Sequence, residues 1–206
     1  MIIAGLTGSI GMGKSTASNM LREMGVPIHD SDATVHELMG KGGKAVAAIA
    51  ALCPECHVDG GIDRKILGKY LFADPALKQA VEDVLFPLVK QSAVDFIALK
   101  KTEGHALAVL DVPLLFEAGW DKMVDKVICV SAPPEVQKAR VMARPGMTEE
   151  RFNAVLKAQM SDADKRAKSD FIIDTGVGMD DTRAQLKKLV DTLRPAARPN
   201  PPGIKP

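Results

Sequence analysis

The apolar residues of this chain gather in short continuous runs, and longer stretches of mixed polarity separate them. Five of the runs have the length and composition of strands, and they cover residues 2–7, 26–29, 106–111, 126–131 and 171–174. Short continuous runs are typical of strands that are covered on both faces, as in a parallel sheet. Because helical patterns separate the runs, the sequence predicts an α/β fold with a five-stranded parallel sheet.

The stretches between the runs show helical spacing and helix-boundary residues. Helices are predicted over residues 16–24, 33–39, 44–52, 63–72, 74–101, 134–144, 149–159 and 181–193. Asp63 and Thr148 are predicted to be N-caps, because their side-chain oxygens can accept hydrogen bonds from the first helical N–H groups. Pro87 is expected to kink or split the longest helix, because it lacks an N–H donor.

The second and third strands are unusually far apart in the sequence. A crossover between parallel strands needs roughly a dozen residues, and residues 30–105 are far more than that. We therefore expect a core formed by residues 1–32 and 106–193, and a helical subdomain, residues 33–105, where a second substrate would bind. A purely structural cover is the alternative for this insert.

A glycine-rich loop follows the first run. Residues 8–15 read GSIGMGKS and fit the phosphate-binding pattern G-x-x-x-x-G-K-[ST]. Such a loop points its N–H groups at phosphate oxygens, and the helix after it adds a positive dipole end. Lys14 would reach the β- and γ-phosphates, and the Ser15 hydroxyl would bind Mg²⁺ together with ATP. The loop residues predicted to bind ATP are Gly8, Ser9, Ile10, Gly11, Met12, Gly13, Lys14, Ser15 and Thr16.

Carboxylates follow the second and third strands. Asp30 and Asp32 end one, and Asp111 ends the other. Ligands of open parallel sheets collect outside the carboxyl ends of the strands, so these residues should face the same cleft as the glycine-rich loop. Either Asp30 or Asp32 could cap the helix that follows, which would leave the other for chemistry.

Polar side chains at helical spacing follow the fourth strand. Gln137, Arg140 and Arg144 are three and four residues apart, so they share one helix face. With Gln159 and Arg166 they suit a lid, at about residues 140–168, that closes on triphosphate. A solvated charged face is the alternative for any single arginine.

Composition narrows the possible partners. The 206 residues carry a net charge of +1, which gives no support for binding to nucleic acid or to an anionic membrane. No apolar run reaches the length of a membrane span, and the first strand begins at the N-terminus without the pattern of a signal peptide. These features favour a cytoplasmic protein, for which we expect a monomer.

Two further features predict local behaviour. Cys53, Cys56 and Cys129 are an odd set that is compatible with reduced thiols, and the C-x-x-C pair lacks the second ligand pair of a zinc site. We therefore expect inert cysteines in a loop. Residues 194–206 contain five prolines and few apolar groups, so we expect a disordered tail.

Taken together, these motifs resemble those of the dephospho-coenzyme A (dephospho-CoA) kinases. The resemblance covers residues 1 to about 178 and rests on the segments 5–16, 30–38 and 112–117, on Asp63-Arg64, and on Gln137, Arg140, Gln159 and Arg166. It implies a three-layer P-loop kinase fold with a helical substrate-binding insert and a lid. It also implies transfer of the ATP γ-phosphate to the ribose 3′-hydroxyl of dephospho-CoA, the last step of coenzyme A synthesis.

The resemblance assigns roles to individual residues. It places the catalytic aspartate at Asp32, and we group Lys14 and Arg140 with it as catalytic residues, with Arg140 also binding ATP. This chain has Phe86-Pro87 where the family usually has His-Pro, and Thr175 where an Asn is more usual.

Other P-loop proteins are the competing interpretations. An adenylate kinase would carry Asp-Gly-Phe-Pro-Arg near the third strand, and a GTPase would carry Asn-Lys-x-Asp for guanine. The sequence contains neither motif. A nucleic-acid-handling ATPase has little support, because the net charge is close to zero and aromatic residues are few.

Overall fold

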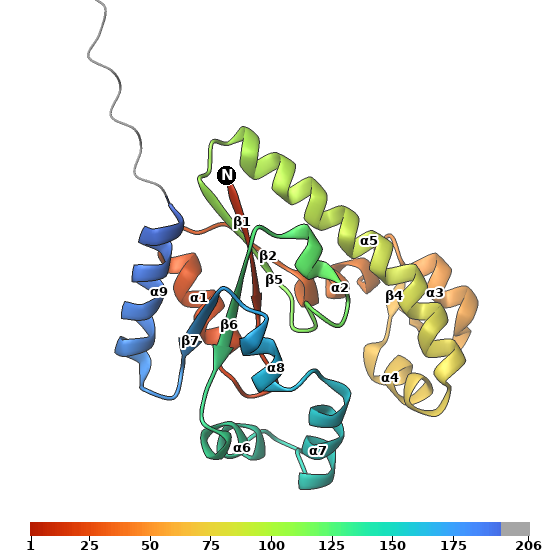
Figure 1. The fold of residues 1–206 in the computed structure, drawn as a ribbon. Helices are drawn as coiled ribbons and strands as arrows, with labels where there is room; N and C mark the ends of the chain where they lie inside the picture. The colour runs from red at the N-terminus through yellow and green to blue at the C-terminus, as the bar shows by residue number, and fades with distance from the viewer. Residues whose placement is uncertain (195–206) are drawn as a thin grey trace, which may run out of the picture. The chain divides into compact units, whose positions relative to one another are not determined.

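The computed structural model of the protein describes residues 1–194, and Figure 1 shows its strands and helices. The main sheet has the strand order β2-β5-β1-β6-β7. Its strands are β1 (Ile2–Thr7), β2 (Ile28–Asp30), β5 (Leu107–Asp111), β6 (Lys126–Ser131) and β7 (Phe171–Asp174). The pairs β1–β6 and β6–β7 are parallel. The prediction of an α/β fold with a five-stranded parallel sheet is confirmed.

The described chain forms two compact units. The first contains residues 1–28, 104–109 and 113–194, and the second contains residues 29–103 and 110–112. The helices of the first unit are α1 (Lys14–Glu23), α6 (Pro134–Met142), α7 (Glu149–Ala158), α8 (Asp162–Ala167) and α9 (Met179–Leu193), with a short 3₁₀ helix η2 (Trp120–Met123). Thr148 caps α7 as predicted, and its hydroxyl accepts the Arg151 N–H at 3.3 Å.

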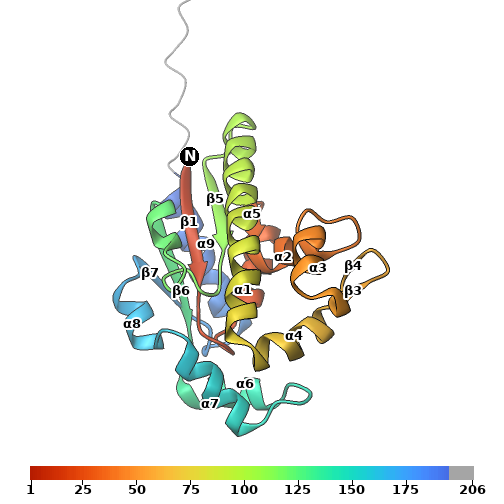
Figure 2. The same ribbon diagram turned by 90° about the vertical axis from the view of Figure 1, so that its right-hand side faces the viewer.

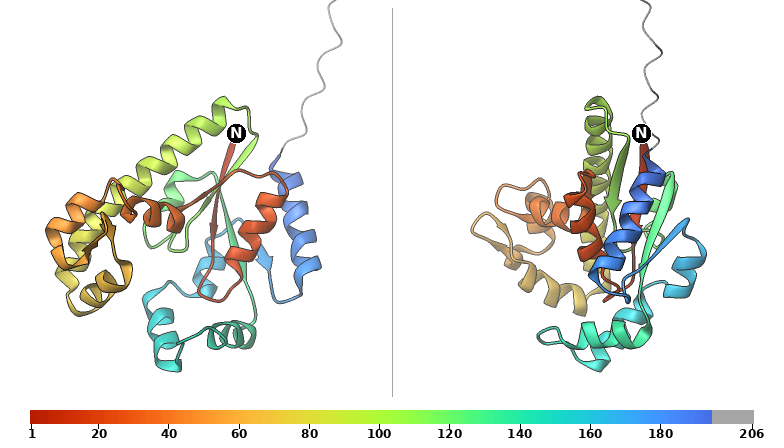
Figure 3. Two further views of the ribbon diagram at one scale, coloured as in Figure 1. Left: turned by 180° about the vertical axis from the view of Figure 1, so that it is seen from behind. Right: turned by 90° about the vertical axis from the view of Figure 1, so that its left-hand side faces the viewer.

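Alternate residues of β1 pack on opposite faces of the sheet. Ala4 and Leu6 are fully buried in a core to which α1 and α9 contribute Leu21 and Leu186. Helices α1 and α9 lie side by side in both views of Figure 3. A Cβ atom at Gly5, between Ala4 and Leu6, would overlap the Leu115 side chain. Helices α1 and α9 therefore cover one face of β1, and the segment after β5 covers the other.

The second unit is mainly helical. It contains α2 (Ser31–Met39), α3 (Val46–Leu52), α4 (Arg64–Ala73) and α5 (Pro75–Thr102), with a 3₁₀ helix η1 (Pro54–Cys56) and a small hairpin of β3 (His57–Val58) and β4 (Gly61–Ile62). Ile49, Leu67 and Val81 belong to a second hydrophobic core, which α3, α4 and α5 share. Asp63 caps α4 as predicted, because its carboxylate accepts the N–H groups of Lys65 and Ile66 at 2.8 and 3.0 Å.

Three details of this unit differ from the predictions. Helix α5 runs unbroken through Pro87, so the prediction that Pro87 splits it is wrong. Buried side chains before and after the proline, Leu85 and Val89 among them, hold both halves in one helix despite the lost hydrogen bond. The hairpin was not predicted, because two-residue strands are too short to show alternation.

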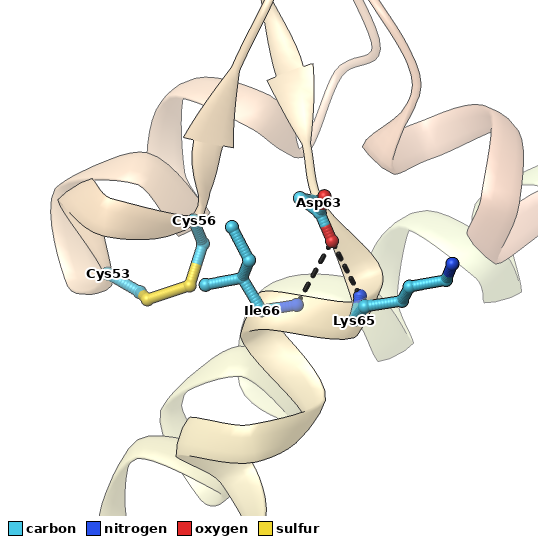
Figure 4. The surroundings of a disulfide bond; sticks show 5 residues. All are labelled: Cys53, Cys56, Asp63, Lys65 and Ile66. Atoms are coloured by element: carbon cyan, nitrogen blue, oxygen red, sulfur yellow. Dashed lines mark hydrogen bonds between the residues drawn. A yellow bond between two sulfur atoms is a disulfide. The ribbon is translucent and has the colours of Figure 1, made fainter.

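The third difference concerns the cysteines. Cys53 and Cys56 form a disulfide (Figure 4), so the expectation of reduced thiols is wrong for this pair. The turn of η1 brings their Cα atoms to 5.5 Å, a separation at which disulfides form. In the first unit, Cys129 is a buried free cysteine, and burial raises the pKa of its thiol to about 11.

The prediction of a disordered tail over residues 194–206 is wrong for Arg194. Arg194 is described, and its guanidinium donates hydrogen bonds to the carbonyls of Met24 (3.4 Å) and Gly25 (2.7 Å) at the end of α1. The remaining tail, 195–206, lies outside the described residues. Up to Arg194, no helix combines the length and the apolar character needed to cross a membrane.

Candidate active site

The loop between β1 and α1 has a backbone that favours glycine at particular positions. Gly11 and Gly13 have φ angles of 78° and 85°, in the left-handed region that other residues rarely adopt. A Cβ atom at Gly8 would lie 2.8 Å from the carbonyl oxygen of Val130. The first helical hydrogen bond of α1 runs from Ala17 N–H to the Gly13 carbonyl, so the N–H groups of the first turn precede it and suit an anion.

Two glutamines from separate segments bond to the backbone of Ile10 in this loop, one to its N–H and one to its carbonyl. Gln137, on α6, donates from Nε2 to the Ile10 carbonyl at 2.8 Å. Gln159, directly after α7, accepts the Ile10 N–H on Oε1 at 3.1 Å. Gln159, which belongs to the predicted lid, and Gln137, which precedes it, therefore both contact the phosphate loop directly. Figure 2 shows α6 and α7, the helices that carry or precede these glutamines.

Thr175 connects the loop to the predicted arginine. Its hydroxyl donates to the Met12 carbonyl at 2.9 Å. The guanidinium of Arg140 donates to the Thr175 hydroxyl at 2.9 Å and to the Thr175 carbonyl at 2.7 Å. Arg140 is thereby held one residue away from the phosphate loop. Threonine at position 175 thus contacts both the loop and the predicted ATP-binding arginine.

The other predicted arginines are not held at the loop in this way. Arg166 lies 4.0 Å from Asp162, one turn earlier on α8, and half of its side chain is exposed. Arg144 lies after the end of α6 and is exposed. Of the three predicted arginines, Arg140 is the one whose guanidinium bonds to a residue that contacts the loop.

In the second unit, the structure shows which of Asp30 and Asp32 caps the helix that follows β2. Asp30 is the N-cap of α2, and its carboxylate accepts the Ala33 N–H at 3.0 Å. Asp32 lies in the first turn of the same helix and is exposed to solvent. Between them, the Ser31 hydroxyl donates to the carbonyl of the buried Asp111 at 3.0 Å. The capping role therefore falls to Asp30.

His29 has a structural environment although it adjoins Asp30. It is buried, its Nε2 lies 3.1 Å from the Ser92 hydroxyl and 3.2 Å from the Thr34 hydroxyl, and its ring packs near Phe96. Burial lowers the pKa of His29, so the neutral imidazole is favoured at neutral pH. Farther along the unit, the guanidinium of Arg64 contacts Nδ1 of His36 at 2.5 Å.

An ion pair in the first unit, between a buried lysine and a part-exposed glutamate, was not predicted. The Lys165 side chain on α8 is fully buried, and its Nζ lies 3.0 Å from Oε1 of Glu117. Burial opposes ionisation of Glu117, but hydrogen bonds from the Met160 N–H and from Lys165 outweigh it and lower the pKa of Glu117. The two residues are far apart in sequence and on separate elements, so no local pattern indicated that they would meet.

Comparison with known proteins identifies the family that carries these features. A family model described as dephospho-CoA kinase matches residues 2–181. The chain belongs to the dephospho-CoA kinase family. A Mesorhizobium japonicum protein named dephospho-CoA kinase is 50% identical to this chain over 194 residues. The aligned residues cover 94% of this chain and 98% of the relative. The predicted enzyme class, a kinase of coenzyme A biosynthesis, is confirmed.

Solved structures agree with this assignment. A crystal structure of a Thermus thermophilus protein is 34% identical in sequence, with a TM-score of 0.80 and coverage of 93% of this chain and 97% of the other. A Campylobacter jejuni dephospho-CoA kinase is 25% identical, with a TM-score of 0.71 and coverage of 93% and 96%. The P-loop kinase fold predicted for this dephospho-CoA kinase family member is thereby confirmed.

Proposed function

We propose that this kinase transfers the γ-phosphoryl group of ATP to the ribose 3′-hydroxyl of dephospho-CoA and so completes coenzyme A synthesis. The observation that carries the proposal is the phosphate loop whose Ile10 backbone is held by Gln137 and Gln159, in a chain of the dephospho-CoA kinase family. Phosphoryl transfer requires positioning and charge neutralisation more than covalent chemistry, and a rigidly held loop supplies both.

ATP is assigned to the first unit. The space beside Gly8, Gly11 and Gly13 is filled by neighbouring protein atoms, so the loop is tightly held. Within residues 1–194 the buried Ser9 hydroxyl has no hydrogen-bond partner, which leaves it available to a phosphate oxygen. Lys14 neutralises charge on the β- and γ-phosphates. Arg140, held by Thr175, adds a second cation on the same side, and residues 140–168 form the lid.

Magnesium is assigned to the same site. Mg²⁺ prefers oxygen ligands and is usually held by one or two protein side chains together with substrate phosphates. The Ser15 hydroxyl, in the first turn of α1, fits that requirement. Bound there, Mg²⁺ would neutralise charge on the phosphates. The protein's own residues orient the triphosphate, exclude water and receive the proton of the acceptor.

The acceptor is assigned to residues 33–105 together with Asp32. Asp32 orients the 3′-hydroxyl and accepts its proton as the bond to phosphorus forms. Its exposure in the first turn of α2 suits contact with a substrate, and Asp30 already serves as the cap. Arg64 begins α4 next to the capping Asp63 and supplies a cation for the phosphates of the acceptor. We further propose a cytoplasmic monomer that does not act on nucleic acid.

A panel of acceptors tests the proposed function. The purified protein is incubated with ATP and Mg²⁺, and ADP release is measured with dephospho-CoA, AMP, adenosine or shikimate as the acceptor. Dephospho-CoA is expected to raise ADP release well above the rate with ATP alone, and the other acceptors are expected to leave it unchanged. Faster ADP release with AMP than with dephospho-CoA would instead indicate a nucleoside monophosphate kinase.

A further inference from the structure

The ion pair between Lys165 and Glu117 has the features of a functional arrangement. The ammonium group of Lys165 has no exposed surface, and it bonds to the Pro113 carbonyl at 3.0 Å as well as to Glu117. Burying a charge is expensive, and an apolar side chain of similar volume is often equally stable or more stable. The cost falls mainly on Lys165, because the Glu117 side chain keeps 21% of its surface exposed. Stability alone therefore gives little reason to place an ion pair here, and its neighbours indicate another role.

One partner of Lys165 leads to the start of the phosphate loop. The Pro113 carbonyl accepts a second hydrogen bond, from the Thr7 hydroxyl at 3.0 Å. Thr7 is the last residue of β1, and the next residue, Gly8, begins the loop. Lys165 and Thr7 thus share one acceptor atom, and the position of that atom fixes the end of β1.

The other partner leads to the middle of the loop. Oε1 of Glu117 accepts the backbone N–H of Met160 at 2.8 Å. Met160 follows Gln159, whose side chain accepts the Ile10 N–H. Fixing the Met160 backbone fixes the point from which Gln159 reaches the loop. The ion pair is therefore connected to the phosphate loop at Thr7 and at Ile10, through two separate sets of hydrogen bonds.

We propose that Lys165 is a positioning residue for phosphoryl transfer, which together with Glu117 holds both Thr7 and Gln159 in the geometry that the phosphate loop needs to bind ATP. Lys165 touches neither substrate and acts through Pro113 and Glu117. This inference rests on the proposed function in one respect, since the loop is taken to bind ATP. Rate losses of about 10²-fold are known when a distant change misplaces reacting groups by about 1 Å.

The test separates positioning from stability with two variants. Lys165→Met removes the ammonium group and leaves the part-exposed Glu117 carboxylate without its cation. The double variant, Lys165→Met with Glu117→Gln, removes both charges but still lacks the bond to the Pro113 carbonyl. Lys187→Met is the matched control, because Lys187 is exposed on α9 and receives the same substitution. The melting temperature Tm, the affinity for ATP without acceptor, and kcat and KM for both substrates are measured for each.

The expected result is a loss of kcat/KM for ATP of about 10- to 100-fold in Lys165→Met, with weaker ATP binding and KM for dephospho-CoA within twofold of the wild type. The double variant should regain Tm without regaining kcat/KM, and the control should match the wild type. Wild-type kcat/KM in a folded Lys165→Met protein overturns the proposal. So does a double variant in which Tm and kcat/KM recover together.

The experiment also gives an answer if Lys165→Met does not fold, or if the wild type does not phosphorylate dephospho-CoA. If Lys165→Met does not fold, the double variant alone decides, because wild-type ATP binding in it overturns the positioning role and weakened binding supports it. If the wild type fails to phosphorylate dephospho-CoA, the proposed function fails at that point. The ATP affinities of the variants, measured by calorimetry without any acceptor, still test the role of Lys165 independently.

Discussion

Exchange of Asp32 for Asn is expected to abolish most of the turnover and leave stability unchanged, and exchange of Asp30 for Ala is expected to do the reverse. The reason is local. The Asp30 carboxylate accepts the Ala33 N–H at 3.0 Å and caps α2, whereas Asp32 is exposed in the first turn of that helix. Asp30 and Asp32 are thus expected to have different roles, Asp30 in the stability of α2 and Asp32 in catalysis.

The magnitudes follow from the two roles. Loss of an Asp N-cap to Ala costs about 1 kcal/mol, and in a chain of this size that lowers Tm by about 2–4 °C. Loss of a general base typically lowers the rate by about 10²–10⁴-fold. Asp32→Asn should therefore show the second effect without the first. Affinity for ATP should stay close to that of the wild type, because Asp32 is assigned to the acceptor.

The assay pairs thermal denaturation with steady-state phosphorylation of dephospho-CoA. Asp30→Asn serves as the control, because Asn caps helices as well as Asp does, so it should keep both Tm and turnover. Full activity in Asp32→Asn together with loss in Asp30→Asn would move the catalytic role two residues upstream and refute the assignment. Full activity in both would leave the acceptor hydroxyl without an identified base.

The remaining predictions concern the loop, the C-terminal contact and the thiols. Lys14→Met should lower kcat by about 10²–10³-fold, as measured by ADP release, because a charge on the β- and γ-phosphates goes unmatched. Deletion of residues 195–206 should leave Tm and turnover within error, whereas Arg194→Ala should lower Tm by a few degrees, because it removes hydrogen bonds to the end of α1. Iodoacetamide at pH 8 should not alkylate folded protein. Denaturation without reductant should expose one thiol, Cys129, and reduction should add two.

Much of the fold could be predicted because its signals are local. Buried strands are continuous apolar runs, and the runs at 126–131 and 171–174 coincide with β6 and β7. Asp63 and Thr148 were identifiable as caps because a cap acts within three residues of its own position. Helix α8 was missed, because six residues are too few to show a period.

The candidate site was only partly predictable, because several of its contacts depend on folding. The loop pattern is contiguous, and Gln137 and Gln159 could be singled out, but their convergence on Ile10 could not be deduced from spacing. Asp30 and Asp32 were both reasonable caps in sequence, and only the backbone decided between them. Glu117 and Lys165 meet across 48 positions, and a buried lysine resembles a surface lysine until its surroundings are known.

The most direct test of the proposed reaction is the structure of its product. The protein is incubated with ATP, Mg²⁺ and dephospho-CoA, and the product is analysed by mass spectrometry and phosphorus NMR. The expected result is coenzyme A with the new phosphate on the ribose 3′-hydroxyl, formed in equal amount to ADP and greatly reduced with Asp32→Asn. ADP formation without coenzyme A, or a phosphate on a different hydroxyl, would contradict the proposed reaction.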